Sequence, residues 1–155
     1  MKKTLCGYAA AAAAIGTLVS ANPAHADVFS MTVNFTNHTA CTLTIRGAEG
    51  NFVFREQPDI SIGVGETSHY ILTFTNFISG IGGNRHQDIS YEAVNCKDDS
   101  LNRRGIGLSI RGTRGVFSYN FNDSSPGFAF DCPRGTSCPI PKNETLSAQA
   151  WEAAR

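Results

Sequence analysis

Residues 105–121 read GIGLSIRGTRGVFSYNF, and this stretch decides the fold. Apolar side chains alternate with small or polar ones along Ile106–Ile110 and again along Phe117–Phe121. A period of two over a short run is typical of a β-strand with one buried face and one exposed face. The glycine-containing turn Arg111–Gly115 joins the two runs and predicts a β-hairpin.

The same alternation recurs upstream, in runs that turn-forming residues separate. These runs are Met31–Phe35, Cys41–Ile45, Ile60–Val64, Tyr70–Phe74 and Ile89–Ala93. No helical period lies between them, and parallel crossovers usually need a helix, so antiparallel pairing is favoured. We therefore predict an all-β fold: a single-domain antiparallel β-sandwich of about eight strands over residues 27–145, with a small barrel as the alternative.

The first 26 residues have the features of a secretory signal peptide. Lys2 and Lys3 precede an apolar run, and Ala24-His25-Ala26 is a small-x-small cleavage site. The run is shorter than the roughly 20 apolar residues of a membrane-spanning helix. We expect cleavage near Ala26 and a mature protein that is secreted or periplasmic.

The chain has five cysteines, of which Cys6 leaves with the leader. An even number in an exported chain predicts two disulfides among Cys41, Cys96, Cys132 and Cys138, with three possible pairings. Proximity favours Cys132–Cys138, which leaves Cys41–Cys96. No Cys-x-x-Cys pair occurs, so the spacing gives little support to zinc, and we predict neither a metal nor another cofactor.

Residues 146–155 form the end of the chain, after the predicted domain, and contain the single tryptophan, Trp151. We expect a C-terminal tail there, with the capacity for a short helix. The tail either frays or docks through Trp151 onto the domain or a partner.

The charge balance excludes one class of partner. The chain has 13 basic and 13 acidic residues, and loss of the leader lysines makes it slightly acidic. Nucleic-acid binders are usually strongly basic, so we predict no nucleic-acid partner. His38, His69 and His86 fit no metal or nucleophile motif, although His86 lies near Asp88. We predict a protein that is not an enzyme, with a small hydrolase as the third hypothesis.

Four arginines are candidate anion-binding residues: Arg103, Arg104, Arg111 and Arg114. They occur in residues 101–122, which contain no carboxylate, and guanidinium groups recognise phosphate and carboxylate. The predicted hairpin puts two of the arginines at its tip and two at its far end. Ordinary solubilising charge is the alternative interpretation.

A glycine-rich apolar segment is the second candidate, with Phe77, Ile78 and Ile81 as its contact residues. Exposed apolar loops often mark membrane or protein contacts, although this one can also fold back onto the core. We therefore expect an exported recognition protein that binds a membrane lipid surface or a glycan. The alternative is a secreted inhibitor or protein-interaction module of the cell envelope. It would present Pro133–Pro141, held by Cys132–Cys138.

Three parts of the chain resemble the aegerolysin group and the related small insecticidal crystal proteins. They are Met31–Asn37 with Cys41–Ile45, then Ile62–Thr67 with Ser79–Gly83 and Ile89–Val94, and finally Phe130–Gly135. The last part is similar to the family's aromatic-Asp-Cys-Pro-Trp-Gly segment, with Arg134 in place of the tryptophan. The resemblance implies a β-sandwich that binds membrane lipids, often as the targeting half of a two-component, toxin-type pore. It makes Arg134 a further candidate binding residue.

Overall fold

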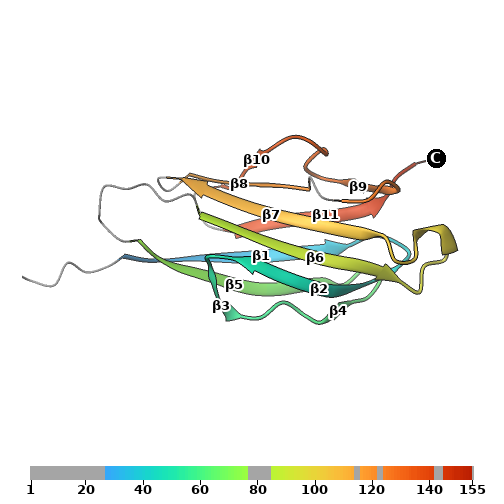
Figure 1. Ribbon diagram of the computed structural model, residues 1–155, viewed down its shortest axis with the longest axis horizontal. Helices are drawn as coiled ribbons and strands as arrows, with labels where there is room; N and C mark the ends of the chain where they lie inside the picture. The colour runs from blue at the N-terminus through green and yellow to red at the C-terminus, as the bar shows by residue number, and fades with distance from the viewer. Residues whose placement is uncertain (1–26, 77–84, 114–115, 122–123, 142–144, 155) are drawn as a thin grey trace, which may run out of the picture.

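The computed structural model describes residues 27–76, 85–113, 116–121, 124–141 and 145–154. They form two β-sheets with a core between them, which confirms the predicted all-β sandwich (Figure 1). Among the residues described, no helix has the length and apolar character needed to cross a membrane. The predicted leader, residues 1–26, lies outside the described residues.

The five-stranded sheet has its strands in the order β3-β5-β1-β11-β9. Their bounds are β1 (Asp27–Asn37), β3 (Val53–Glu56), β5 (Thr67–Asn76), β9 (Phe128–Phe130) and β11 (Thr145–Glu152). The six-stranded sheet has the order β10-β8-β7-β6-β2-β4. Its strands are β2 (Thr42–Gly50), β4 (Ser61–Ile62), β6 (Arg85–Val94), β7 (Gly105–Thr113), β8 (Val116–Asn120) and β10 (Cys138–Pro139). A 3-10 turn, η1 (Asp99–Leu101), lies between β6 and β7.

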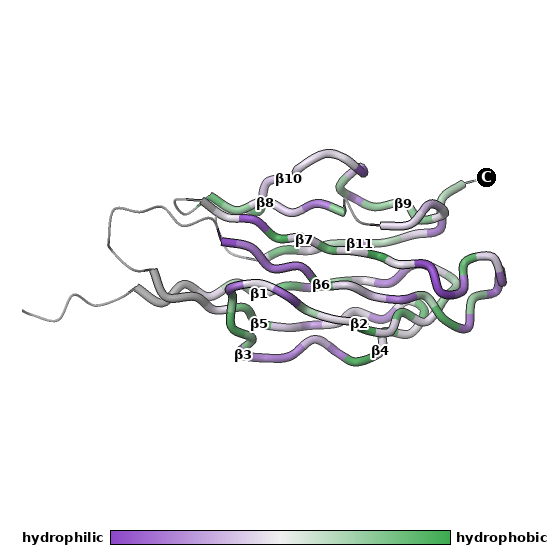
Figure 2. The backbone as a smooth tube through the Cα atoms, in the orientation of Figure 1, coloured by the Kyte–Doolittle hydropathy of each residue, from purple (hydrophilic) through white to green (hydrophobic). Residues whose placement is uncertain are grey.

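The two sheets meet through the alternate side chains that the sequence pattern marks as buried. Phe35 of β1 stacks on Tyr91 of β6 with ring centroids 4.9 Å apart, so the contact joins the two sheets. Phe121 stacks on Phe130 at 4.1 Å and adds a second aromatic contact between them. Figure 2 shows hydrophobic and hydrophilic residues alternating along the strands. The polar alternate positions therefore form the two outer faces of the sandwich.

The C-terminal segment corrects the sequence prediction. Residues 145–152 are not a tail or a short helix but strand β11, between β1 and β9. It runs parallel to β1, with Phe35 opposite Ala148 and Asn37 opposite Ala150, so the sandwich is not purely antiparallel. The alanines favour a helix locally, but they are also small enough to lie buried beside large side chains, and tertiary packing overrides propensity.

Both disulfides form with the pairing that proximity favoured. Cys132–Cys138 closes a short loop between cysteines six residues apart, and Cys41–Cys96 joins cysteines 55 residues apart. The long-range disulfide ties the residue before β2 to the second residue after β6. Two disulfides indicate an oxidising compartment, outside the reducing cytosol.

Candidate functional site

An open groove of about 480 Å³ lies on the outer face of the six-stranded sheet, across β2, β6 and β7. Its lining residues are Gly47, Ala48, Glu49, Asp88, Ile89, Ser90, Gly105, Ile106, Gly107, Leu108 and Ser109. Strand alternation explains the composition, because Ile89, Ile106 and Leu108 are buried in the core, whereas Glu49 and Ser90 are exposed. Cross-strand pairing puts Gly47 opposite Ser90 and Ser90 opposite Gly107, so one row of the floor carries almost no side-chain bulk.

Two of the floor glycines, Gly47 and Gly105, have room for a side chain, and Gly47 lies at a bulge in the β2–β6 register, a position that often takes glycine. Gly47 and Gly105 are not among the residues with positive φ. A Cβ on Gly47 would lie 3.6 Å from Ser90 Oγ, and one on Gly105 would lie 3.8 Å from Ser125 Oγ, both ordinary contacts. Glycine in a strand costs about 0.5–1 kcal/mol relative to alanine. The two glycines therefore weaken the sheet locally and leave the groove open.

Gly112 of β7 differs from Gly47 and Gly105, because it has no room for a side chain. A Cβ there would lie 2.2 Å from the ring of Phe117, the residue opposite it on β8, so packing excludes any side chain. Packing in the core therefore explains Gly112, whereas neither packing nor a positive φ requires glycine at Gly47 and Gly105.

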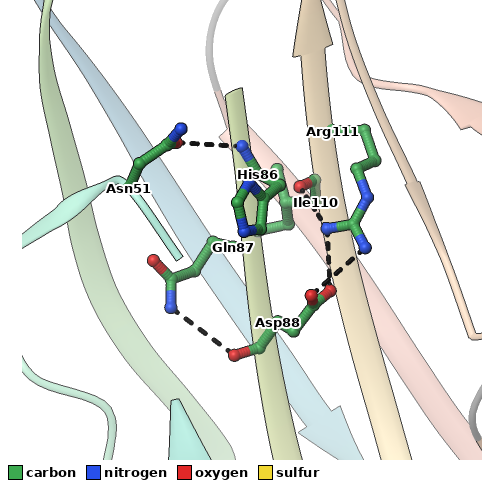
Figure 3. A network of polar contacts seen from close by, with 6 residues as sticks. All are labelled: Asn51, His86, Gln87, Asp88, Ile110 and Arg111. Atoms are coloured by element: carbon green, nitrogen blue, oxygen red, sulfur yellow. Dashed lines mark hydrogen bonds and ion pairs between the residues drawn. The ribbon is translucent and has the colours of Figure 1, made fainter. Parts of the chain in front are cut away.

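Asp88, a lining residue of the groove, forms an ion pair with Arg111 (Figure 3). Arg111 donates from Nη1 to Asp88 Oδ1 at 2.8 Å and from Nη2 to Asp88 Oδ2 at 3.1 Å. Partial burial raises the pKa of Asp88, but hydrogen bonds from Arg111 and Ser109 and the charge of Arg111 outweigh burial. The pKa of Asp88 therefore lies below its usual value, and the group is a carboxylate at neutral pH.

The histidine–carboxylate arrangement that the sequence allowed is not formed. Asp88 turns to Arg111, and no hydrogen bond joins it to the ring of His86 in the part of the chain that the structure describes (Figure 3). The backbone N–H of His86 donates to Asn51 Oδ1 at 3.0 Å. Nearby, Gln87 is buried and its Oε1 has no hydrogen-bond partner among the described residues.

The other two histidines also lie outside the cavities. His38 stacks on Trp151 with ring centroids 5.4 Å apart, and His69 Nδ1 lies 2.7 Å from Asn34 Oδ1. Both histidines are exposed: His69 is on β5 of the five-stranded sheet, and His38 directly follows β1 of the same sheet. Neither they nor His86 line the groove or the smaller cavity described below. Among the described residues, no group of three or more side chains has the arrangement of a metal site.

The three predicted arginines of this segment that the structure describes, Arg103, Arg104 and Arg111, are not gathered into one patch. Arg111 is near the end of β7, whereas Arg103 and Arg104 precede its start. Arg104 donates from Nε to Ser100 O at 3.2 Å and lines a separate cavity of about 330 Å³ that also contains Asp98 and Glu152. Arg103 is exposed, with a backbone φ of 65°.

Arg134 lies in the loop that the Cys132–Cys138 disulfide closes. Its Nη2 donates to Ser125 O, and the backbone N–H of Thr136 donates to Pro133 O at 3.0 Å. The loop is therefore a hydrogen-bonded turn, and the side chains of Pro133 and Arg134 are exposed on it.

Four of the predicted binding residues fall outside the described residues: Phe77, Ile78, Ile81 and Arg114. The described residues that flank them are Asn76, Arg85 and Thr113, at the ends of β5, β6 and β7. These strand ends lie at the same end of the sandwich (Figure 1).

The groove itself was missed by the sequence analysis. The available signal was the glycine at alternate positions of an outward strand face, Gly105 and Gly107, since glycine inside a strand often marks close approach of another molecule. No protein-family model matches the chain, and no curated protein is detectably similar to it.

Proposed function

We propose that this protein is an exported, non-catalytic recognition protein that binds a glycan in the groove on the six-stranded sheet. The observation that carries the proposal is the pair Gly47 and Gly105, which weaken their strands although a side chain would fit at both positions, and which leave the groove open. Proteins tolerate such local costs where function needs the space. The disulfides support an extracytoplasmic location, and cleavage near Ala26 is part of the proposal.

The lining chemistry suits a polyhydroxylated ligand. Ser90 offers an exposed hydroxyl group, while Glu49 and Asp88 offer carboxylate oxygens that accept hydrogen bonds from sugar hydroxyls. The groove is open rather than enclosed, so an extended chain can lie across the strands. Asp88 is held ionised by Arg111, which makes it a poor proton donor and supports binding over acid catalysis.

The test measures binding of the mature protein, beginning at Asp27, to soluble polysaccharides by isothermal titration. Gly47→Val and Gly105→Val fill the groove, so we expect each to lower affinity at least tenfold while the melting temperature is unchanged or raised. Ser147→Val, on the exposed face of β11, is the matched control and should bind like the parent. Unchanged binding by both groove variants would refute the assignment.

A membrane lipid surface remains the second candidate, through the aegerolysin resemblance. The contact residues Phe77, Ile78, Ile81 and Arg114 would insert or pair with headgroups, together with Arg111. The flanking strand ends share one end of the sandwich, which favours a common contact surface. Flotation with anionic liposomes tests this version. No binding, or binding unaffected by Arg111→Ala combined with Arg114→Ala, rules it out.

Protein interaction is the third candidate. The exposed turn at Arg134, closed by Cys132–Cys138, is a rigid presented loop, and rigid loops bind with little ordering cost. A pull-down from the envelope of the producing cell tests it with the parent and with Arg134→Ala. Loss of a specific partner in the variant supports an interaction module, whereas identical profiles count against it.

A further inference from the structure

We propose that the groove prefers glycans that carry protonated amino groups over neutral glycans, and neutral glycans over acidic ones. This inference rests on the proposed function, because it names the ligand class of the same groove. Among the described residues, two charged side chains line the groove, those of Glu49 and Asp88, and both are acidic. The part of the chain that the structure describes contributes no lysine or arginine to the lining.

The two carboxylates differ in how their charges are balanced. Asp88 is neutralised by Arg111, which approaches from outside the lining. Glu49 is exposed and forms no ion pair within the described residues. The nearest basic residue of its own strand, Arg46, is paired with Glu92 of β6. The groove therefore keeps one uncompensated negative charge.

The strand register also brings the two carboxylates of the groove close to each other. Glu49 lies directly opposite Asp88 in the β2–β6 pairing. Like charges directly opposite each other destabilise a sheet, and Arg111 relieves the repulsion only from the β7 side. An ammonium group in the groove beside Glu49 would relieve it from the other side and gain a charge-assisted hydrogen bond.

The arginine-rich segment predicted an anionic partner, whereas the contacts of these arginines favour a cationic ligand in the groove. Arg111 has both terminal nitrogens bound to Asp88, and Arg104 and Arg134 donate to backbone carbonyls. An acidic ligand in the groove would face Glu49 without a free lining cation. We therefore expect acidic polysaccharides to be the weakest ligands.

The experiment compares three probes on the mature protein: chitosan oligosaccharide, its fully N-acetylated counterpart, and hyaluronan oligosaccharide. At pH 5.5, where carboxylates are ionised and sugar amines largely protonated, we expect chitosan to bind roughly fivefold tighter than the neutral probe. The preference should weaken in high salt, because Glu49 is exposed.

The variant Glu49→Gln tests the preference for amino-bearing glycans separately from glycan binding itself. We expect this variant to bind the neutral probe like the parent and to lose the preference for chitosan. Glu56→Gln, an exposed glutamate on β3 of the other sheet, is the matched control and should keep the preference. Equal binding of chitosan and the neutral probe by the parent, or a preference that survives Glu49→Gln, overturns the inference alone. Absence of binding to all three probes overturns the proposed function as well.

Discussion

Arg111 on β7 reaches diagonally to Asp88 on the neighbouring strand β6 and donates to it from both terminal nitrogens, at 2.8 and 3.1 Å. In the register of β6 and β7, Arg111 faces His86 and Asp88 faces Ser109. The arginine therefore bypasses its direct neighbour and pairs with the carboxylate two residues along. This choice fixes the charge pattern of the groove, because it leaves Glu49 as the lining carboxylate without a cation.

The Asp88–Arg111 pair should make a small, pH-dependent contribution to stability. A carboxyl whose pKa is lowered by folding stabilises the native state above its unfolded pKa of about 3.9 and loses that contribution as the pH falls through the folded value. The side chains are 43% and 41% exposed, so we expect less than about 1 kcal/mol.

The measurement is urea unfolding of the parent, Asp88→Asn, Arg111→Gln and the double variant, at pH 7 and at pH 2.5. A double-mutant cycle should give a coupling energy at pH 7 that shrinks at pH 2.5. A coupling that grows on acidification contradicts the assignment.

Asn37→Ala should be strongly destabilising. The buried Asn37 side chain donates to the carbonyls of Cys41, Ile62 and Gly63 at 2.8–3.1 Å and accepts from Thr39. Its removal leaves several buried polar groups unpaired, so we expect a loss of about 2–4 kcal/mol in the free energy of unfolding.

Asn34→Ala is the control for this prediction, because Asn34 lies on the same strand but faces outward. It should change stability by less than about 0.5 kcal/mol. Equal losses in the two variants would show that Asn37 does not organise the end of β1.

Ala148→Asp should unfold the domain or cost at least about 3 kcal/mol. Ala148 is fully buried in β11, opposite Phe35, and a carboxylate there would have no partner. Ser147→Asp, one residue earlier and exposed, should be within about 0.5 kcal/mol of the parent. If the segment were a frayed tail, both variants would behave like the parent in thermal melts.

Removal of the two disulfides should cost unequal amounts. In the chain-entropy model, the 55-residue separation of Cys41–Cys96 gives about 4 kcal/mol and the six-residue separation of Cys132–Cys138 gives about 2 kcal/mol. Paired Cys→Ala variants, compared by urea unfolding, check this order. A larger loss from the short loop would mean that the turn at Arg134 stabilises the sandwich beyond its effect on the unfolded chain.

Much of the fold was predictable because strand alternation is a local signal. Each of the seven alternating runs lies in or overlaps a strand, from β1 to β8 with the exception of β3. The missed strands are short or atypical: β10 has two residues, β9 three and β3 four. β11 was missed because alanine at its buried positions has no β preference of its own.

Little of the candidate site was predictable, because a groove is a property of several strands together. The arginine pattern singled out Arg111 as a candidate, but the partner of Arg111 is set by the register of β7 with β6. Gly47 and Gly105 are far apart in the sequence and become one floor only when β2, β6 and β7 lie side by side.

The sequence by itself determined the all-β class, most strand positions, the buried face of each strand and the most plausible cysteine pairing. The strand positions depend on the period of the side chains, and the cysteine pairing depends on separation along the chain. Both can be read from the sequence alone. Only the tertiary structure decided that the last segment enters a sheet parallel to the first strand, that Asp88 takes the charge of Arg111, and that the glycines share a groove. Each of these depends on which distant strands pair and in which register, and a single chain pattern does not encode that choice locally.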